Sequence, residues 1–414
     1  MNVLRGLFGL TAICLFVWAI SENRKEIQFR TVAMGLLLQI VTAFLALKIA
    51  LIRSFFLFLN EAVMVIEKAT VAGTTLTFGY LGGGKLPFEE KIPGGSFIFA
   101  FQSLPMVLVI SALSSLLFYF KVLPFMVKVF SFILQKIMKV GGAVGLCASA
   151  TVFVGMVEAP LFIKPYLKNM SRGELFAIMT TGMATIAGTV MVLYASILSR
   201  VLPDALAQIL LHSIISAPAA LVCSMLMVPP ASKIQAHELA APQIYKSSLD
   251  AIVKGTSDGV ELLISIIAML IVFVALVSLA NFALGILPDF YGKPVTLQRI
   301  LGVIMSPVVW TIGIPWEEAQ TAGALMGTKT ILNEFVAYID FANLPKGALS
   351  QRSSVIMLYA MCGFANLGSL GILIAGLGTM APEKKDVVIS LGFKSILTGT
   401  LASCMTGAVI GMFY

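Results

Sequence analysis

Two carboxylates, Glu158 and Glu334, lie in stretches of the sequence that are otherwise largely apolar. Glu158 belongs to TVFVGMVEAPLFIKPYL (residues 151–167), where the helix breakers Gly155 and Pro160 flank it, and Glu334 belongs to TILNEFVAYIDF. An ionisable side chain in apolar surroundings is costly, and in a membrane it marks a solute or ion pathway by default. The alternative is that each acid caps a neighbouring helix N-terminus, but the matching contexts of the two acids favour one shared site.

Neutral polar residues accompany the two acids in short glycine-containing motifs. ATIAGT (residues 184–189) follows the segment of Glu158, and GFANLGS (residues 363–369) follows the segment of Glu334. A cavity with acidic charges and neutral donors and acceptors suits an uncharged, hydroxyl-rich solute better than an anion. The neutral groups are Thr151, Thr185, Asn333, Asn366 and Ser369.

The composition places these residues in a membrane protein. Of the 414 residues, 59% are hydrophobic and only 12% are charged, whereas a soluble globular protein carries about 25% charged residues. Apolar runs of about 20 residues recur along the chain, which is the length needed to cross a hydrocarbon core ~30 Å thick. We therefore predict an all-α, multi-pass membrane protein whose candidate spans are residues 4–20, 31–52, 96–119, 175–199, 203–228, 262–287, 353–379 and 387–413.

The net charge of +8 is explained by membrane topology, so we expect lipid and not nucleic acid as the surrounding partner. Lys and Arg gather in alternate loops, and the positive-inside rule places those loops in the cytoplasm and both termini on the opposite side. Lys346 and Arg352 depart from this rule. The five cysteines all fall in apolar stretches and are predicted to pack as small hydrophobic residues without forming disulfides.

The elements that would position the two acids form a repeat. Each acid follows or interrupts a broken apolar hairpin, which is followed by a glycine-interrupted helix and then by an uninterrupted helix. The single span 262–287 separates the two copies, so they enter the membrane from opposite faces. Inverted repeats of this kind place substrate and ion sites near the bilayer midplane in secondary transporters. A broken helix frees backbone groups that survive only against protein or a watery cavity.

This repeat gives four segments along the chain. Residues 1–139 are expected to form scaffold helices, including helices along the membrane interface at 53–72 and 121–139, and residues 140–228 form the first transport repeat. Residues 229–305 are a linker with the sixth span, and residues 306–414 form the second transport repeat.

An enzyme and a channel are the other classes of function considered. An intramembrane enzyme needs a nucleophile with a base or a metal cluster, yet the two histidines are distant in sequence, and neither H-E-x-x-H nor G-x-S-x-G occurs. A channel needs long polar stripes along its pore, and these are missing from the apolar spans. The residues therefore favour a transporter, and no cofactor is expected.

The same residues carry a resemblance to a known family. VGMVEAPLFIKPYL, MATIAGTVMVLYAS, IPWEEAQTAGALMGTKTILNEFVAY and YAMCGFANLGSLGI resemble the concentrative nucleoside transporters, in order along nearly the whole chain. The resemblance implies a homotrimer in the bacterial inner membrane, with about eight spans and two re-entrant hairpins. It also implies cation-coupled import of nucleosides, such as uridine or adenosine, by an elevator-like movement.

The resemblance also assigns roles to individual residues. Glu334, Asn366 and Ser369 would bind the ribose hydroxyls and Phe364 would line the cavity, while Met156, Val157 and Glu158 would face the nucleobase with Val190 nearby. An ionised carboxylate can accept two hydrogen bonds from vicinal hydroxyls, and such a site rejects analogues that lack them. The side chains or carbonyls of a sodium site would come from Thr151, Val154, Thr185 and Ile186.

Two departures from the family pattern leave questions open. Met156-Val157 replaces the usual Gln-Thr pair, so purine and pyrimidine preferences are both open. The Val157 side chain also removes one oxygen from the sodium site, and a cation that lacks a ligand binds more weakly unless water fills the gap. A proton carried by Glu158 is therefore slightly favoured as the coupling ion, with sodium as the alternative. A transporter for another small, neutral, hydroxyl-rich solute is the second alternative.

Overall fold

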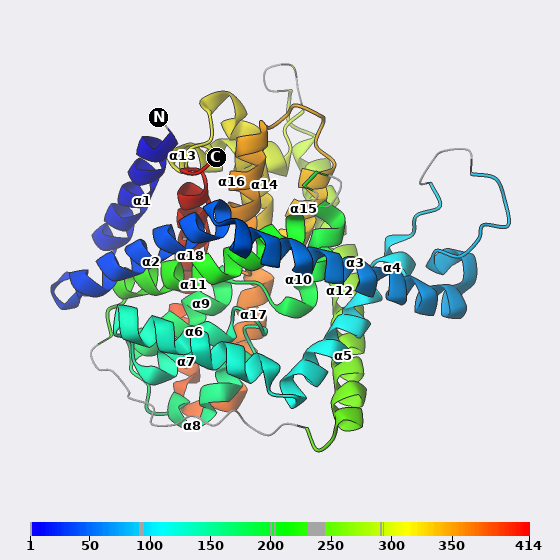
Figure 1. Ribbon diagram of the computed structural model, residues 1–414. Helices are drawn as coiled ribbons and strands as arrows, with labels where there is room; N and C mark the ends of the chain where they lie inside the picture. Colours follow the sequence, from blue (N-terminus) through cyan, green and yellow to red (C-terminus); the bar gives the residue numbers. More distant parts are fainter. Residues whose placement is uncertain are drawn as a thin grey trace.

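The computed structural model describes residues 2–90, 95–198, 201–202, 204–230, 245–289, 292 and 294–414. Every regular element within these ranges is a helix, so the all-α prediction is confirmed. Figure 1 shows a packed helical body from which α3 (Ala50–Phe78) and the chain after it project, with both termini near one end of the body. Most of the linker predicted between the two repeats, residues 231–244, lies outside the described residues.

The described part of the chain contains seven helical segments that are long and apolar enough to cross a membrane, or eight when a bent pair counts as one span. The seventh predicted span, 353–379, is not among these segments, because it is built as two short helices, α16 (Gln351–Met361) and α17 (Leu367–Met380), on either side of a break. The prediction of about eight spanning elements is confirmed. The seven segments are α1 (Asn2–Ala19), α2 (Phe29–Lys48), α4 to α5 (Phe99–Tyr119), α9 to α10 (Arg172–Leu198), α11 (Ala205–Met227), α12 (Ser248–Leu284) and the turn with α18 (Pro382–Ile410).

The first repeat begins with a broken hairpin, as predicted. Helix α7 (Gly142–Ala150) ends before an irregular turn, and the chain returns through the 3-10 helix η3 (Ala159–Ile163) and the single turn α8 (Lys164–Leu167). A proline in the first turn of η3 and another in that of α8 limit helix formation there, because proline lacks a backbone donor. The chain then forms α9 (Arg172–Ala184), α10 (Gly188–Leu198) and α11.

The second repeat has the same order of elements. Its hairpin is α14 (Trp316–Ile331) and α15 (Glu334–Ala342), which meet at Leu332 and Asn333. The broken helix α16 to α17 and the uninterrupted helix α18 (Lys385–Ile410) follow. In Figure 1, α7 and α8 lie in the lower half of the molecule and α14 and α15 in the upper half, so the hairpins enter from opposite ends.

The two segments predicted to lie along the membrane interface are both helical. The first is part of α3, and the second is α6 (Val122–Met138). Helix α6 buries Val127, Leu134 and Met138 on one stripe and exposes Phe125 and Phe132 on another. A helix that buries one apolar face and presents lysines and aromatic rings on the other suits the boundary between lipid and water.

Two helices differ from the sequence prediction. Helix α12 begins 14 residues before the expected start at residue 262. Ser247 caps its N-terminus, and Lys254 pairs with Asp250 at 3.2 Å one turn apart, so the helix continues through polar residues that hydropathy does not detect. Helix α13 (Leu297–Thr311) was not predicted. It crosses the 305/306 segment boundary and is bent by 116° against α14.

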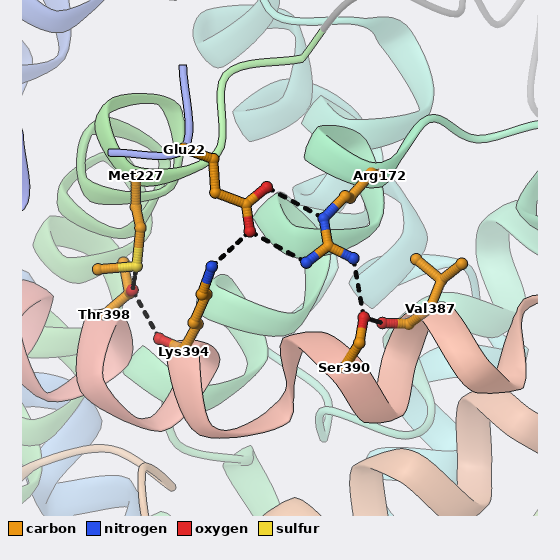
Figure 2. Close-up of polar contacts among 7 residues, drawn as sticks. All are labelled: Glu22, Arg172, Met227, Val387, Ser390, Lys394 and Thr398. Atoms are coloured by element: carbon orange, nitrogen blue, oxygen red, sulfur yellow. Dashed lines mark hydrogen bonds and ion pairs between the residues drawn. The ribbon is translucent and has the colours of Figure 1, made fainter. Parts of the chain in front are cut away.

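A charged cluster joins the connection between α1 and α2 to the N-terminal parts of α9 and α18. Figure 2 shows Glu22, between α1 and α2, accepting hydrogen bonds of 3.0 Å from Arg172 Nε and Nη2 at the start of α9. The Nζ of Lys394 in α18 also contacts Glu22, and Arg172 donates to the Ser390 hydroxyl at 2.8 Å. The hydrogen bond from Arg172, together with Lys394, lowers the pKa of Glu22 to about 2.

Arg352, one of the two exceptions to the charge rule, has a structural role. Its guanidinium donates to the Gly313 carbonyl at 2.7 Å and to the Gly411 carbonyl at 2.9 Å. These carbonyls lie just beyond the C-termini of α13 and α18, where a positive charge is favourable. Helix capping therefore explains a cation at the end of the molecule where the termini lie.

Candidate functional site

Both hairpin tips line one cavity of about 230 Å³. The first tip contributes residues 155–158, and the second contributes residues 333–335. The helix breaks of the two repeats supply further lining residues, including Val190 on α10 and Phe364 before α17. The structure thus brings together all eight residues that were expected to contact a substrate: Met156, Val157, Glu158, Val190, Glu334, Phe364, Asn366 and Ser369.

Glu334 lies at the start of α15, and each of its carboxylate oxygens has a hydrogen-bond donor. The Tyr194 hydroxyl donates to Oε1 at 2.7 Å, and the Asn366 side-chain amide donates to Oε2 at 2.8 Å. The residue is 3% exposed. A carboxylate buried this deeply is stable only when it is hydrogen-bonded, because its desolvation is costly. These contacts leave further lone pairs on both oxygens for a solute.

Glu158 is held differently, because its carboxylate turns back over its own hairpin. A methyl group added at Gly155 would lie 2.0 Å from Glu158 Oε2, so a larger residue there would displace the carboxylate from this position. The backbone N–H groups of Val157 and Glu158 interact with the carboxylate, and the side chain is exposed at the cavity. The first hairpin tip therefore presents an acid to the cavity, fixed by its backbone.

The remainder of the first tip is apolar. Met156 is 7% exposed, and a methyl group at Gly376 on α17 would lie 2.9 Å from a methyl carbon of Val157. Val157 therefore packs against the second repeat. Neither side chain carries a donor or acceptor that could read a nucleobase edge.

Helix α12 forms a wall of the cavity that sequence reasoning did not assign. Five of its lining side chains are apolar and one carries a hydroxyl, and they recur at helical spacing. In the sequence they look like the rest of an apolar span. The lining residues on α12 are Leu262, Ser265, Ile266, Met269, Leu270 and Phe273.

The two uninterrupted helices stabilise the helix breaks. His212 on α11 approaches the Ala184 carbonyl at the end of α9 at 3.0 Å through Nε2, which must carry the proton because a carbonyl only accepts. In the second repeat, Ser403 on α18 donates to the Cys362 carbonyl at 2.9 Å, at the end of α16. Each repeat thus supplies a donor to a carbonyl freed by its own break, which would be costly to leave unpaired.

The two breaks also touch each other. Gly363 has φ = +143°, and a methyl group there would lie 3.0 Å from the Met183 carbonyl oxygen next to the first break. Glycine is required both by this backbone conformation and by the close approach. The contact explains why residues from two distant parts of the sequence line one cavity.

The four residues expected at a cation site, Thr151, Val154, Thr185 and Ile186, are outside the lining of the cavity. Thr151 and Thr185 are both buried, and their hydroxyls donate to the carbonyls of Ala148 and Thr181, each at 2.9 Å. Since the protons point at carbonyls, the hydroxyl oxygens keep lone pairs for a cation. Hydroxyl and carbonyl oxygens are ligands suited to a hard cation such as sodium.

Two polar residues near Glu334 were missed by sequence reasoning. Tyr194 was not predicted, because LYASIL reads as part of a uniformly apolar helix. Lys329 on α14 is fully buried, and its Nζ has no hydrogen-bond partner among the residues that the structure describes. Glu334 interacts with it electrostatically. The rule that a charged residue within a membrane segment marks a functional site would have identified Lys329.

Comparisons with known proteins match most of the chain. Residues 8–81 match the family described as Na+ dependent nucleoside transporter N-terminus, and residues 208–411 match its C-terminus. Residues 100–201 match the family described as nucleoside recognition. These family descriptions concern transport and recognition, not enzymes.

Among curated proteins, the chain is 35% identical to the nucleoside permease NupC of Helicobacter pylori, covering 98% of this chain and 96% of that protein. It is 36% identical to the uncharacterized transporter YutK of Bacillus subtilis, covering 100% of both. It is also 32% identical to the rabbit (Oryctolagus cuniculus) sodium/nucleoside cotransporter 1, over 99% of this chain and 63% of that protein.

Among solved structures, the fold is similar to that of CNTnw. The inward-facing, substrate-bound state gives a TM-score of 0.92 at 34% identity, covering 100% of this chain and 98% of that one. An outward-facing state of a CNTnw variant gives 0.91 at the same identity and coverage. Inward-facing and outward-facing states are both known for this neighbour.

Proposed function

This chain belongs to the family of Na+ dependent nucleoside transporters, the concentrative nucleoside transporters, and we propose that it imports nucleosides by symport with a cation. The observation that carries this proposal is the shared cavity, to which each of the two inverted hairpins contributes an acidic tip. Glu334 is the group suited to a ribose, since its oxygens have lone pairs left for two vicinal hydroxyls.

The remaining substrate contacts divide between sugar and base. Asn366 and Ser369, at the start of α17, would complete the sugar site with Glu334, and Phe364 would cover it. Met156, Val157, Glu158 and Val190 would surround the base. Because Met156 and Val157 lack polar groups, we propose that the base is held mainly by shape and by Glu158, so purine and pyrimidine nucleosides both fit.

For the coupling ion we propose a proton, carried by Glu158. The carboxyl group opens on the substrate cavity, and Val157 brings no oxygen to the cation site that Thr151, Val154, Thr185 and Ile186 would form. Sodium is the alternative, supported by the names of the family and of the rabbit relative. The hydroxyl oxygens of Thr151 and Thr185 and the carbonyls of Val154 and Ile186 would then be its ligands.

For the transport cycle we propose elevator-like alternating access in a homotrimer of the bacterial inner membrane. Residues 140–228 and 306–414 would move as the transport unit, and residues 1–139 and 229–305 would provide the scaffold. Support for a movement of this kind comes from the inward-facing and outward-facing states of CNTnw. Support for a partner surface comes from α12, whose most apolar stretch is unburied within one chain.

A second candidate is transport of another small, neutral, hydroxyl-rich solute. The apolar first tip favours this alternative, because recognition would then depend on the sugar-like hydroxyls alone. The two candidates share the Glu334 site and differ in whether an isolated sugar is sufficient.

The test is uptake by purified protein in liposomes. Radiolabelled uridine and adenosine are offered with a proton gradient alone, with a sodium gradient alone and with neither. We expect accumulation above equilibrium when the proton gradient is imposed, with competition by unlabelled nucleoside and none by ribose. Absence of gradient-driven accumulation of either nucleoside would defeat the proposal. Undiminished uptake with the sodium gradient alone would show that sodium, and not the proton, is the coupling ion.

A further inference from the structure

We propose that Tyr194 is a positioning residue for the sugar site, which fixes the Glu334 carboxylate in the orientation that selects ribonucleosides over deoxyribonucleosides. This inference rests on the proposed function of Glu334. Tyr194 is on α10, in the first repeat, whereas Glu334 and Asn366 belong to the second. The sugar site would therefore be completed across the two repeats.

The hydrogen bond from Tyr194 is short and buried. The hydroxyl lies 2.7 Å from Glu334 Oε1, and the tyrosine is 4% exposed although it lines the cavity. A hydrogen bond to an ionised carboxylate is stronger than a neutral one, and burial strengthens it further because the local dielectric constant is low. Tyr194 therefore contributes to holding Glu334 in its ionised, acceptor form.

The tyrosine ring is itself held in place. Its centroid lies 5.3 Å from that of Tyr338 and 5.9 Å from that of Phe335, both on α15, in tilted arrangements favourable for aromatic pairs. With its ring packed in this way, Tyr194 cannot swing away from Glu334. The hydroxyl is thus a fixed donor, and the carboxylate must orient to meet it.

The two donors together fix the plane of the carboxylate. Tyr194 holds one oxygen and Asn366 holds the other, so rotation about the last side-chain bond would break both contacts. The acceptor capacity that the carboxylate keeps therefore points in a fixed direction, which favours hydroxyl donors placed as in a vicinal diol. Without the Tyr194 hydroxyl, the carboxylate keeps the Asn366 amide and its own backbone N–H as donors but loses the side-chain donor at Oε1, so its orientation toward a diol is less restricted.

The test is Tyr194→Phe, with dissociation constants measured by calorimetry for uridine, 2′-deoxyuridine and 3′-deoxyuridine. We expect uridine to bind about ten-fold more weakly than to the wild type. A deoxyuridine already lacks one hydroxyl that would bind Glu334, so its affinity should fall less. The ratio of the deoxyuridine to the uridine dissociation constant should therefore decrease by about three-fold or more. An equal loss for all three ligands, or no loss for uridine, would overturn the inference.

The matched control is Tyr338→Phe. Tyr338 is also fully buried and adjoins Tyr194, but its hydroxyl donates to the Leu358 carbonyl at 3.3 Å and it does not line the cavity. Its loss should leave the ribose preference unchanged, and a change as large as that of Tyr194→Phe would count against a specific role. Loss of binding in Glu334→Gln with an unchanged preference in Tyr194→Phe would reject this inference alone. Failure of the wild type to bind any nucleoside would reject the proposed function itself.

Discussion

Asn366 binds Glu334 with one end of its side chain and caps a helix with the other. Its Nδ2 donates to Glu334 Oε2 at 2.8 Å, and its Oδ1 accepts the backbone N–H of Ser369 at 2.8 Å at the start of α17. Since the oxygen must face the backbone N–H, the amide group must face the carboxylate. The broken helix thus sets the orientation of the amide that binds Glu334, and the break is part of the cavity.

The first prediction is that Glu334→Gln abolishes ribonucleoside binding. A glutamine has one acceptor oxygen where the carboxylate has two. With that oxygen toward the Asn366 amide, its own amide faces Tyr194 and presents N–H groups where a sugar hydroxyl needs an acceptor. Loss of two charge-assisted hydrogen bonds to the sugar costs about 3 kcal/mol, or roughly a hundred-fold in affinity. Calorimetric titration with uridine measures this loss.

The control is Glu317→Gln, at the exposed far end of the same hairpin arm, which should bind as the wild type does. Retained affinity in Glu334→Gln would remove Glu334 from the sugar site.

The second prediction concerns the base. Met156→Gln adds a donor and an acceptor at a cavity-lining position where the wild type has neither. We expect the ratio of the dissociation constants for uridine and adenosine to change by about five-fold, because one new hydrogen bond contributes about 1 kcal/mol and only one base edge will match it. Competition of unlabelled nucleosides with labelled uridine measures the ratio. Met156→Leu, which keeps the apolar character and a similar volume, should leave it unchanged. If the glutamine behaves like the leucine, Met156 does not face the base.

The third prediction is that Val157→Thr creates a dependence on sodium. The hydroxyl restores the oxygen ligand that the family has at this position, in a side chain of nearly the same shape. Since Val157 packs against α17 near Gly376, an unpaired hydroxyl there should lower stability by about 1–3 kcal/mol in the absence of a cation. We expect the Tm of the variant to rise with NaCl but not with choline chloride, and that of the wild type to respond to neither. A second substitution, Thr151→Val, should remove the response. A wild type that is already stabilised by sodium would contradict proton coupling.

Much of the site could be predicted from the sequence, because residues that are costly in an apolar segment, such as carboxylates and helix breakers, are easy to recognise there. Glu158 and Glu334 stand out among apolar neighbours, and the glycines and prolines beside them mark the breaks. Gly155 and Gly363 lie where a side chain would meet the Glu158 carboxylate or the Met183 carbonyl. The order of broken and unbroken helices was enough to predict that the two acids share a cavity.

What could not be predicted has no such pattern. Tyr194 and the lining residues of α12 are of types that are common in apolar helices. Their position at the cavity depends on how the helices pack and not on local sequence. The first turns of α12 are polar, and hydropathy detects the apolar part of a helix and not its full length. Lys329 was detectable as a charge in a membrane segment, but its nearness to Glu334 follows only from the packing of α14 beside α15.

The fourth prediction concerns pH and the Glu22 cluster. Arg172 and Lys394 hold the pKa of Glu22 at about 2, below its ordinary value of 4.5. A lowered carboxylate pKa stabilises the fold above about 4.5, and this contribution is lost as the pH falls toward 2. We expect Glu22→Gln to lower the Tm at pH 7 by about 2 °C, as for a partly exposed bidentate ion pair, and by less at pH 3. Thermal unfolding in detergent at both pH values measures the difference.

The control for this cluster is Glu26→Gln in the same connection. Glu26 is exposed and takes part in none of the ion pairs found within the described residues. Its substitution should leave the Tm unchanged at both pH values. A Tm difference for Glu22→Gln that is the same at pH 3 as at pH 7 would show that packing, and not the charge of Glu22, is responsible.

The last prediction is that Gly188→Ala disables transport. Gly188 begins α10 after the first helix break, and a methyl group there would lie 2.7 Å from the Phe153 carbonyl oxygen in the turn of the first hairpin. A backbone atom cannot yield as a flexible side chain can, so either the hairpin turn or α10 must move, at a cost of about 1–3 kcal/mol. Both carry cavity residues, Glu158 on one side and Val190 and Tyr194 on the other. We therefore expect uptake to fall ten-fold or more, with a lower Tm.

Gly371→Ala on α17 is the matched control, because nothing lies within 4 Å of its added methyl group. Alanine favours a helix over glycine by about 0.5–1 kcal/mol, so this variant should transport normally and be no less stable. Equal behaviour of the two variants would mean that the contact between hairpin and helix break does not hold the site together.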